Sequence, residues 1–160
     1  MRSIKNIDNK TLFAAVLLVA YLAILLKLLI FKYPPGMVFD VTSSYYGNYM
    51  PFKTILPYLS GEPTWNVAIR NLAGNIIPFI PLGFFAPILY RALTWKHIFA
   101  IALAFSLAIE GTQVVLRTGI FDVDDILLNV LGIVLGYCAF IGVKRIVRHI
   151  LNKGPIKREF

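Results

Sequence analysis

The chain has 160 residues, of which 58% are hydrophobic and only 15% are charged. Because a soluble globular domain carries about 25% charged residues, this composition excludes an ordinary soluble domain and predicts a single membrane domain over residues 1–160. The net charge of +8 does not indicate nucleic-acid binding, since basic residues gather in the cytoplasmic segments of membrane proteins. The single cysteine, Cys138, excludes an intramolecular disulfide.

Four apolar runs are each long enough to cross a hydrocarbon core of about 30 Å as a helix, at about 1.5 Å per residue. The runs cover about 11–32, 67–90, 98–116 and 126–143, and a basic tail follows over 144–160. The first run is longer than the apolar part of a signal peptide, and no small-x-small cleavage site follows it, so we expect it to be retained. The pattern predicts an all-α membrane protein, built as a four-helix transmembrane bundle.

The charges are distributed unevenly over the segments between these runs. If both termini are cytoplasmic, the inner segments hold 11 basic and 2 acidic residues, whereas the outer part holds 5 basic and 6 acidic residues. Basic residues prefer the cytoplasmic side of a membrane. We therefore predict a multipass protein of the cytoplasmic membrane with both termini inside.

The predicted outer loop, residues 34–66, is rich in tyrosine, phenylalanine and tryptophan. Tyrosine and tryptophan are common at membrane–water interfaces. Within the loop, residues 51–59 combine apolar and basic side chains, which predicts a short helix on the outer leaflet. An unstructured aromatic loop is the alternative.

The second run contains Pro78, Pro81 and Pro87. Each proline removes a backbone donor, so we expect a kinked or broken helix. Asn71 and Asn75 lie on one face of its outer half. Irregular backbone at membrane depth is tolerated where it is buried or lines a polar cavity, so these amides are candidates to face a site; a merely kinked packing helix is the alternative.

The third run carries a polar stripe formed by Ser106, Glu110, Gln113 and Arg117, which fall within about 60° of one another on a helix. Glu110 lies about 10 Å deeper than Arg117. An ionisable side chain near the middle of a membrane helix costs about 2.5–3.5 kcal/mol, so we expect a partner or a function to retain it. Hydrogen bonds that only hold helices together are the alternative.

The fourth run places Asp125, Asn129, Gly132 and Gly136 on one face, together with Asp122 at its start. Asp124 points about 100° away from Asp125. We expect Asp122 and Asp124 each to be solvated or to cap the helix. The two glycines allow a close helix approach. That approach could occur inside the bundle or against a second protomer, so an oligomer through Gly132 and Gly136 is one prediction.

The polar residues of the second, third and fourth runs suggest a site. Glu110 and Asp125 are the hypothetical catalytic pair, with Glu110 as general acid or base. We expect substrate binding by six further residues: Asn71, Asn75, Gln113, Arg117, Asp122 and Asn129. Arg117 would act as an anion clamp. In the first run, Lys27 either extends toward the membrane surface or pairs with Glu110 or Asp125.

No cofactor or metal site is predicted, since the sequence has no Asp-x-Asp-x-Asp-Gly loop. A divalent cation held by carboxylate oxygens is the alternative to that expectation.

Several short patterns follow one another in a characteristic order: Asn48-x-x-Pro51-Phe52, Asn71-x-x-x-Asn75, Phe79-x-Pro81-Leu82-Gly83, Glu110-x-x-Gln113, Arg117, and Asp122-x-x-Asp125-x-x-x-Asn129-x-x-Gly132-x-x-x-Gly136. Over about residues 20–140 the chain resembles the VanZ-like family of bacterial membrane proteins, whose founder is associated with resistance to the glycopeptide teicoplanin. The resemblance implies a small multipass protein of the bacterial cytoplasmic membrane, with a role in glycopeptide resistance or cell-envelope modification.

Three functions remain open at this point. The first is a non-enzymatic resistance protein whose outward polar pocket binds a cell-wall precursor or a glycopeptide. The second is an intramembrane enzyme that acts on a lipid-linked or cell-wall substrate through Glu110 and Asp125. The third is a transporter or a helix-packing scaffold without catalysis. In all three the lipid bilayer is a partner and nucleic acid is not.

Overall fold

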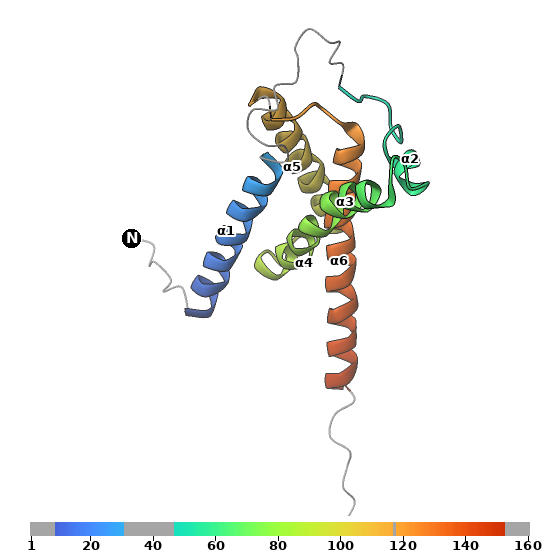
Figure 1. Ribbon diagram of the computed structural model, residues 1–160. Helices are drawn as coiled ribbons and strands as arrows, with labels where there is room; N and C mark the ends of the chain where they lie inside the picture. Colours follow the sequence, from blue (N-terminus) through green and yellow to red (C-terminus); the bar gives the residue numbers. More distant parts are fainter. Residues whose placement is uncertain (1–8, 31–46, 117, 153–160) are drawn as a thin grey trace, which may run out of the picture.

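The computed structural model describes residues 9–30, 47–116 and 118–152, and the described part is built from helices (Figure 1). In chain order the elements are α1 (Asn9–Ile30), α2 (Ile55–Leu59), α3 (Trp65–Ile76), the 3₁₀ turn η1 (Ile77–Phe79), α4 (Ile80–Leu89), α5 (Trp95–Val115) and α6 (Val123–Asn152). Apart from an isolated parallel bridge between Asn48 and Asp122, no β-structure occurs in these three ranges.

Three stretches of the described chain are long and apolar enough to cross a membrane: Trp65–Leu89, Trp95–Val115 and Val123–Asn152. The prediction of an all-α membrane protein is thereby confirmed. A helix, α1, also occupies the first predicted run, and its side chains include the exposed Leu12, Val16 and Val19. Since α1 is not among the three stretches, the count of four crossings stays a prediction.

α6 is longer than its apolar run predicts. It begins at Val123 and continues to Asn152, past the expected end at residue 143. Its last part carries Lys144, Arg145 and Arg148, and lysine and arginine are good helix formers. Hydropathy marks the end of an apolar stretch rather than the end of a helix, so the first turns of the predicted basic tail belong to α6.

The second predicted helix is broken, as its prolines predict. α3 ends at Ile76, η1 makes one 3₁₀ turn that contains Pro78, and α4 begins with Pro81 in its first turn. A 3₁₀ turn accommodates prolines that cannot donate to the helical ladder. The Tyr21 hydroxyl of α1 donates a hydrogen bond to the Pro78 carbonyl oxygen, so α1 is tied to the break.

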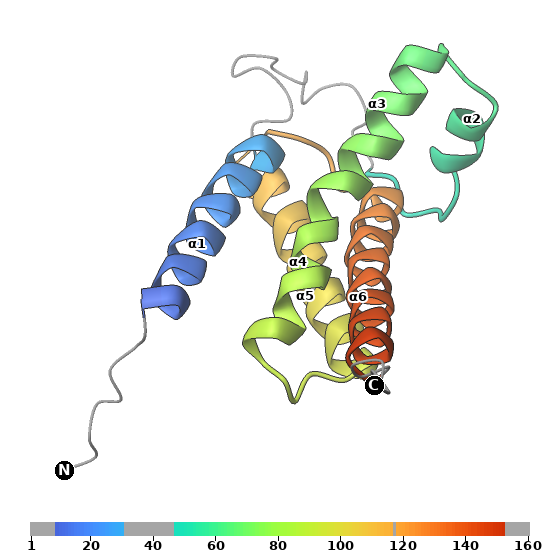
Figure 2. The same ribbon diagram turned by 90° about the horizontal axis from the view of Figure 1, so that it is seen from below.

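α6 lies at the centre of the bundle, where it packs against α3, η1, α4 and α5, while α1 contacts α5 (Figure 2). The helices approach closely at glycines. A Cβ atom on Gly83 would lie 1.8 Å from the Ile133 carbonyl oxygen, and one on Gly136 would lie 1.9 Å from that of Ile80. Phe79, fully buried at the break, is the largest residue of the apolar core, whose other members are Leu25, Ile98, Ala102, Ile109, Ile126, Val130 and Ile133.

The glycine face of α6 is therefore filled within one chain. A Cβ on Gly132 would lie 2.3 Å from the Ile76 carbonyl oxygen, so both glycines of the predicted pair meet the broken helix of their own bundle. This contact lies inside the bundle of one chain, and an oligomer through Gly132 and Gly136 stays a prediction.

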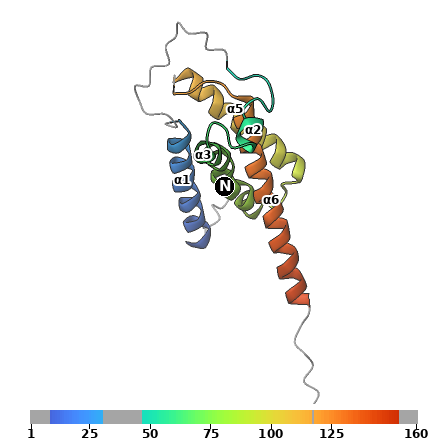
Figure 3. The ribbon, with the colours of Figure 1, turned by 45° about the vertical axis from the view of Figure 1, so that its right-hand side comes forward.

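The segment before α3 covers the beginning of α6. Of the helix predicted over 51–59, only Ile55–Leu59 forms α2, which packs against α3, and Figure 3 shows α2 near the upper end of the bundle. Phe52 takes a positive φ of 67°, a value uncommon for a residue other than glycine. This conformation turns the chain so that several backbone N–H groups point at α6, which positions the site described next.

Candidate functional site

Asp124, at the beginning of α6, accepts five hydrogen bonds from residues 48–55. Its side chain is fully buried and accepts hydrogen bonds from the backbone N–H of Phe52 (2.5 Å), Thr54 (2.7 Å) and Ile55 (3.2 Å). The Thr54 hydroxyl (2.8 Å) and the Asn48 amide (3.4 Å) donate to it as well. The expectation that Asp124 is solvated or only caps the helix is wrong, because the 48–55 segment covers the side of α6 on which it lies.

Asp122 caps α6. Its Oδ1 accepts a hydrogen bond from the backbone N–H of Asp124 at 2.8 Å and another from the Asn48 side-chain amide at 2.7 Å. The Asn48 backbone adds two bonds, donating to Phe121 O at 2.7 Å and accepting from Val123 N at 2.9 Å. Asn48 thereby joins the outer segment to the start of α6 through both its backbone and its side chain.

The environment of Asp122 raises the pKa of this carboxyl above its ordinary value of 3.8. Burial is the main cause, since a low-dielectric environment disfavours the charged form. The hydrogen bonds from Asn48 and from the Asp124 backbone oppose this effect, and the charges of Asp125 and Asp124 add to it.

The polar stripe of α5 faces the bundle interior. Ser106, Glu110 and Gln113 are all buried, with exposed fractions of 0%, 1% and 4%. Glu110 Oε2 accepts a hydrogen bond from the Asp122 backbone N–H at 3.0 Å. Glu110 therefore connects α5 to the residue that caps α6.

The two predicted amides of α3 behave differently. The Asn75 side chain is buried and donates to Asp125 Oδ1, which joins α3 to α6. The Asn71 amide instead donates to the Val67 carbonyl oxygen of its own helix at 2.9 Å. Asn71 is one helical turn away from Asn75, yet its amide bonds to the backbone of its own helix and not to α6.

Two buried polar atoms lie deeper between α5 and α6. Ser106 Oγ and Asn129 Oδ1 have no hydrogen-bond partner within the described residues. Lys27 is exposed on α1, and its pairing with Glu110 or Asp125 stays a prediction. Arg117, the predicted anion clamp, lies outside the described residues.

The cluster around the start of α6 thus contains Glu110, Asp122, Asp124 and Asp125, and the helix dipole favours negative charge at this end. Carboxylate and amide oxygens bind hydroxyl, amide or ammonium groups of a ligand. In the parts of the chain that the structure describes, no three histidine, cysteine, aspartate or glutamate side chains meet in an arrangement that would hold a metal ion.

The residues that sequence reasoning missed are Asp124 and Thr54. Asn48 occurs in one of the patterns that carry the family resemblance, but no role was predicted for it. For Thr54 the sequence contains no signal, since its contact with Asp124 spans 70 residues.

Known proteins of similar sequence show which family this chain belongs to. The VanZ/LLP1 family model matches residues 18–147, most of the chain. The chain belongs to the VanZ/LLP1 family. It is similar to Protein VanZ of Enterococcus faecium, with 28% identity over 120 residues that cover 75% of this chain and 68% of that protein. No solved structure gives a significant match. The matched region of this VanZ/LLP1 protein contains the whole carboxylate cluster and the broken helix.

Proposed function

We propose that this VanZ/LLP1 protein acts in glycopeptide resistance or cell-envelope modification, with the cluster at the start of α6 facing the outside of the cell. The observation that carries the proposal is the concentration of buried carboxylates where α3, α5, α6 and the 48–55 segment meet. The family's association with teicoplanin resistance supports the same function.

The charges of the described helices support the orientation. Glu110 and the three aspartates that follow it lie where α5 ends and α6 begins, whereas Arg91 follows the stretch that ends at Leu89 and Lys144 and Arg148 lie in the last part of α6. Basic residues favour the cytoplasmic side. The protein is then a multipass protein of the bacterial cytoplasmic membrane, with cytoplasmic termini and an outward-facing cluster.

In this cluster Asp125 is the carboxylate best placed to meet a ligand, since its side chain is only partly buried and Asn75 holds it in position. Gln113, Asn129, Asp122 and, if it lies on the same face, Arg117 would complete the binding set. A glycopeptide or a cell-wall precursor presents amide, hydroxyl and charged groups that such a set binds.

The test measures the teicoplanin sensitivity of a susceptible Gram-positive host with and without the protein. Expression of the native chain raises the inhibitory concentration, and Asp125→Ala abolishes the increase. Glu62→Gln is the matched control, since Glu62 is an exposed carboxylate outside the cluster. Immunoblots of membranes must show equal amounts of each variant. Unchanged sensitivity on expression of the native chain would contradict the proposal.

Burial of Glu110 favours a second candidate, an intramembrane enzyme. The Glu110 carboxyl is 1% exposed and contacts the Asp122 backbone, three residues before the partly buried Asp125, so the two carboxyls are candidates for an acid–base pair. Glu110→Gln separates the two functions, because glutamine keeps the oxygen that accepts from Asp122 N but transfers no proton. Loss of resistance in Glu110→Gln, at normal membrane levels, supports proton transfer by Glu110. Retained resistance excludes the catalytic role and leaves the structural one.

A further inference from the structure

A second polar site lies at the opposite end of the bundle from the carboxylate cluster. A cleft of about 640 Å³ opens between the end of α4, the connection to α5 and the last part of α6. Four of its lining residues are basic: Arg91, Lys144, Arg145 and Arg148. The other lining residues are Pro87, Ile88, Leu93, Tyr137, Phe140 and Ile141, so no acidic side chain lines the cleft.

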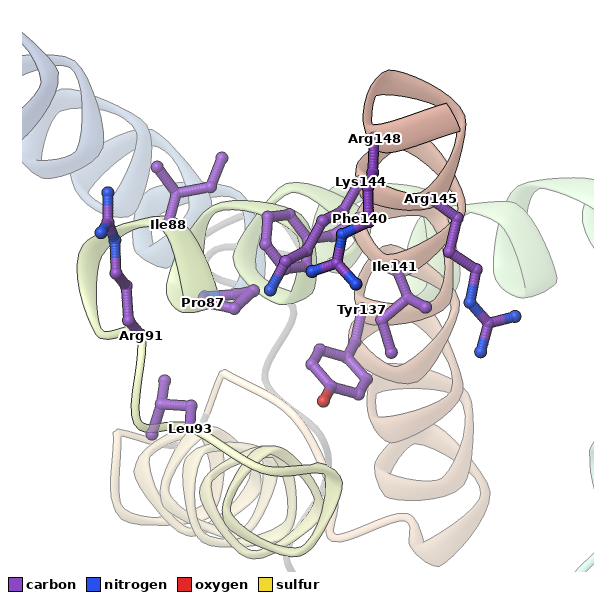
Figure 4. Close-up of a pocket in the computed structure, with 10 residues that line it drawn as sticks. All are labelled: Pro87, Ile88, Arg91, Leu93, Tyr137, Phe140, Ile141, Lys144, Arg145 and Arg148. Atoms are coloured by element: carbon purple, nitrogen blue, oxygen red, sulfur yellow. The ribbon is translucent and has the colours of Figure 1, made fainter. Parts of the chain in front are cut away.

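Two of the basic side chains and one aromatic side chain of the cleft occupy a single stripe of α6. Phe140, Lys144 and Arg148 follow one another at four-residue spacing, which places them on one face of a helix. In Figure 4 Lys144 and Arg148 extend from α6 toward α4, whereas Arg145 extends from the other side of α6. The Lys144 ammonium lies over the Phe140 ring, 5.8 Å from its centroid. The cations therefore stand directly beside the apolar surface.

The acidic residues that the structure describes lie elsewhere. They are Glu62, Glu110, Asp122, Asp124 and Asp125. Within the described ranges the basic groups of the cleft thus have no carboxylate of their own chain to neutralise them, so an external anion would meet a positive charge that is not already paired.

The cleft lies where lipid headgroups would be. The apolar stretch that includes α4 ends at Leu89, and the next one begins at Trp95, so the connection between them is at the edge of the hydrocarbon region. Tyr90 and Trp95, 69% and 64% exposed, flank this connection. Exposed tyrosine and tryptophan are typical of the membrane–water interface.

We propose that this cleft binds the phosphate group of an anionic phospholipid. The guanidinium groups of Arg91 and Arg148 provide the fork geometry that suits phosphate oxygens, and Lys144 adds a point charge. The wall formed by Pro87, Ile88 and Phe140 holds the first part of the acyl chains. Basic clefts between helices at the cytoplasmic side suit such headgroups.

The experiment measures lipid binding to the purified native protein by native mass spectrometry, with phosphatidylglycerol and phosphatidylcholine of identical acyl chains as probes. We expect phosphatidylglycerol to bind at least about tenfold more tightly than phosphatidylcholine. The triple variant Arg91→Gln, Lys144→Gln, Arg148→Gln loses this preference. A control that removes three cations outside the cleft, Lys53→Gln, Arg70→Gln, Lys96→Gln, keeps it.

A third arm uses inorganic phosphate in place of lipid. If phosphate alone displaces phosphatidylglycerol at similar concentration, the acyl chains contribute nothing and the lipid assignment is overturned. Equal binding of the two lipids, or equal selectivity in the native protein and the triple variant, overturns the proposal as well. Thermal unfolding of each variant verifies the fold, and the single change Arg91→Gln, in the exposed connection, replaces the triple variant if that one does not fold.

Discussion

At the scale of single residues, Asp124 holds the outer segment in place. Four of its hydrogen bonds come from Phe52, Thr54 and Ile55, which lie in a short stretch of chain turned by the positive φ of Phe52. A buried carboxylate that accepts several N–H bonds stabilises both itself and the backbone that donates to it. Asp124 thereby connects the segment around Thr54 to the start of α6, 70 residues later in the chain.

We expect removal of the Asp124 carboxylate to lower the stability of the protein strongly and to loosen residues 52–55. Asp124→Ala leaves the N–H groups of Thr54 and Ile55 without their acceptor, and we expect a destabilisation of about 3 kcal/mol. Asp122→Ala, the matched change two residues earlier, removes a helix cap and costs only about 1 kcal/mol. Thermal unfolding in detergent measures both, and faster hydrogen exchange at 52–55 locates the effect of the first. Equal losses in the two variants would contradict this role of Asp124.

The raised pKa of Asp122 predicts how its contribution to the free energy of unfolding changes with pH. Because burial raises its pKa in the folded protein, the folded state binds the proton more tightly than the unfolded state. The contribution of Asp122 to stability is therefore lost as the pH rises from about 3.8 through the raised pKa. Asp122→Asn keeps an oxygen for Asn48 and for the Asp124 N–H but does not titrate.

We thus expect the stability of Asp122→Asn relative to the native protein to increase as the pH rises from about 3.8 through the raised pKa, and then to level off. Unfolding midpoints of the two proteins at each pH measure this difference, which cancels the titration of the other carboxyls. A difference that decreases with pH would mean that Asp122 is held in its charged form.

At the scale of elements, glycines determine how closely α4 and α6 approach. Gly83 faces the Ile133 carbonyl and Gly136 faces the Ile80 carbonyl, each at a distance that admits no Cβ. Gly142, in the same helix as Gly136, has open space around its Cα. The three positions therefore differ in packing and not in helix propensity.

Alanine at these positions should have opposite effects. Gly136→Ala and Gly83→Ala force the two helices apart and destabilise the protein by about 1–3 kcal/mol, whereas Gly142→Ala is neutral or stabilises it by up to about 1 kcal/mol. Unfolding of the purified variants in one detergent measures all three. A destabilising Gly142→Ala would show that glycine is needed for a reason other than helix contact.

Prediction from sequence succeeded where the information is local to one element. Hydropathy located the helices, the prolines predicted the break between α3 and α4, and the glycine spacing predicted a close contact of α6. The same reasoning failed for Asp124, because helical phasing says which residues share a face of α6 but not that the 48–55 segment covers another face. Phasing also does not say that the Asn71 amide donates to its own helix, and the binding role of Asn71 stays a prediction.

At the scale of the whole molecule, the division of charge between the two ends predicts the topology. The cluster at the start of α6 and the basic cleft lie at opposite ends of the apolar stretches. If the three stretches Trp65–Leu89, Trp95–Val115 and Val123–Asn152 all cross the membrane, Ser60 and Asn152 lie on opposite sides of it. Ser60 is then outside and Asn152 is inside.

Whether α1 also crosses decides the side of the N-terminus. α1 has 22 residues, about 33 Å at the helical rise, and it contacts α5 inside the bundle. If α1 crosses, Ser3 and Asn152 are on the same, cytoplasmic side; if α1 remains on one side, Ser3 is outside with Ser60.

Single cysteines at these three positions in a Cys138→Ala background, labelled with a membrane-impermeant maleimide, distinguish the two topologies. We expect Ser60→Cys to react in intact cells, and Ser3→Cys and Asn152→Cys to react only after permeabilisation. Labelling of Ser3→Cys in intact cells would reduce the crossings to three, and labelling of Asn152→Cys would reverse the orientation on which the outward-facing cluster depends.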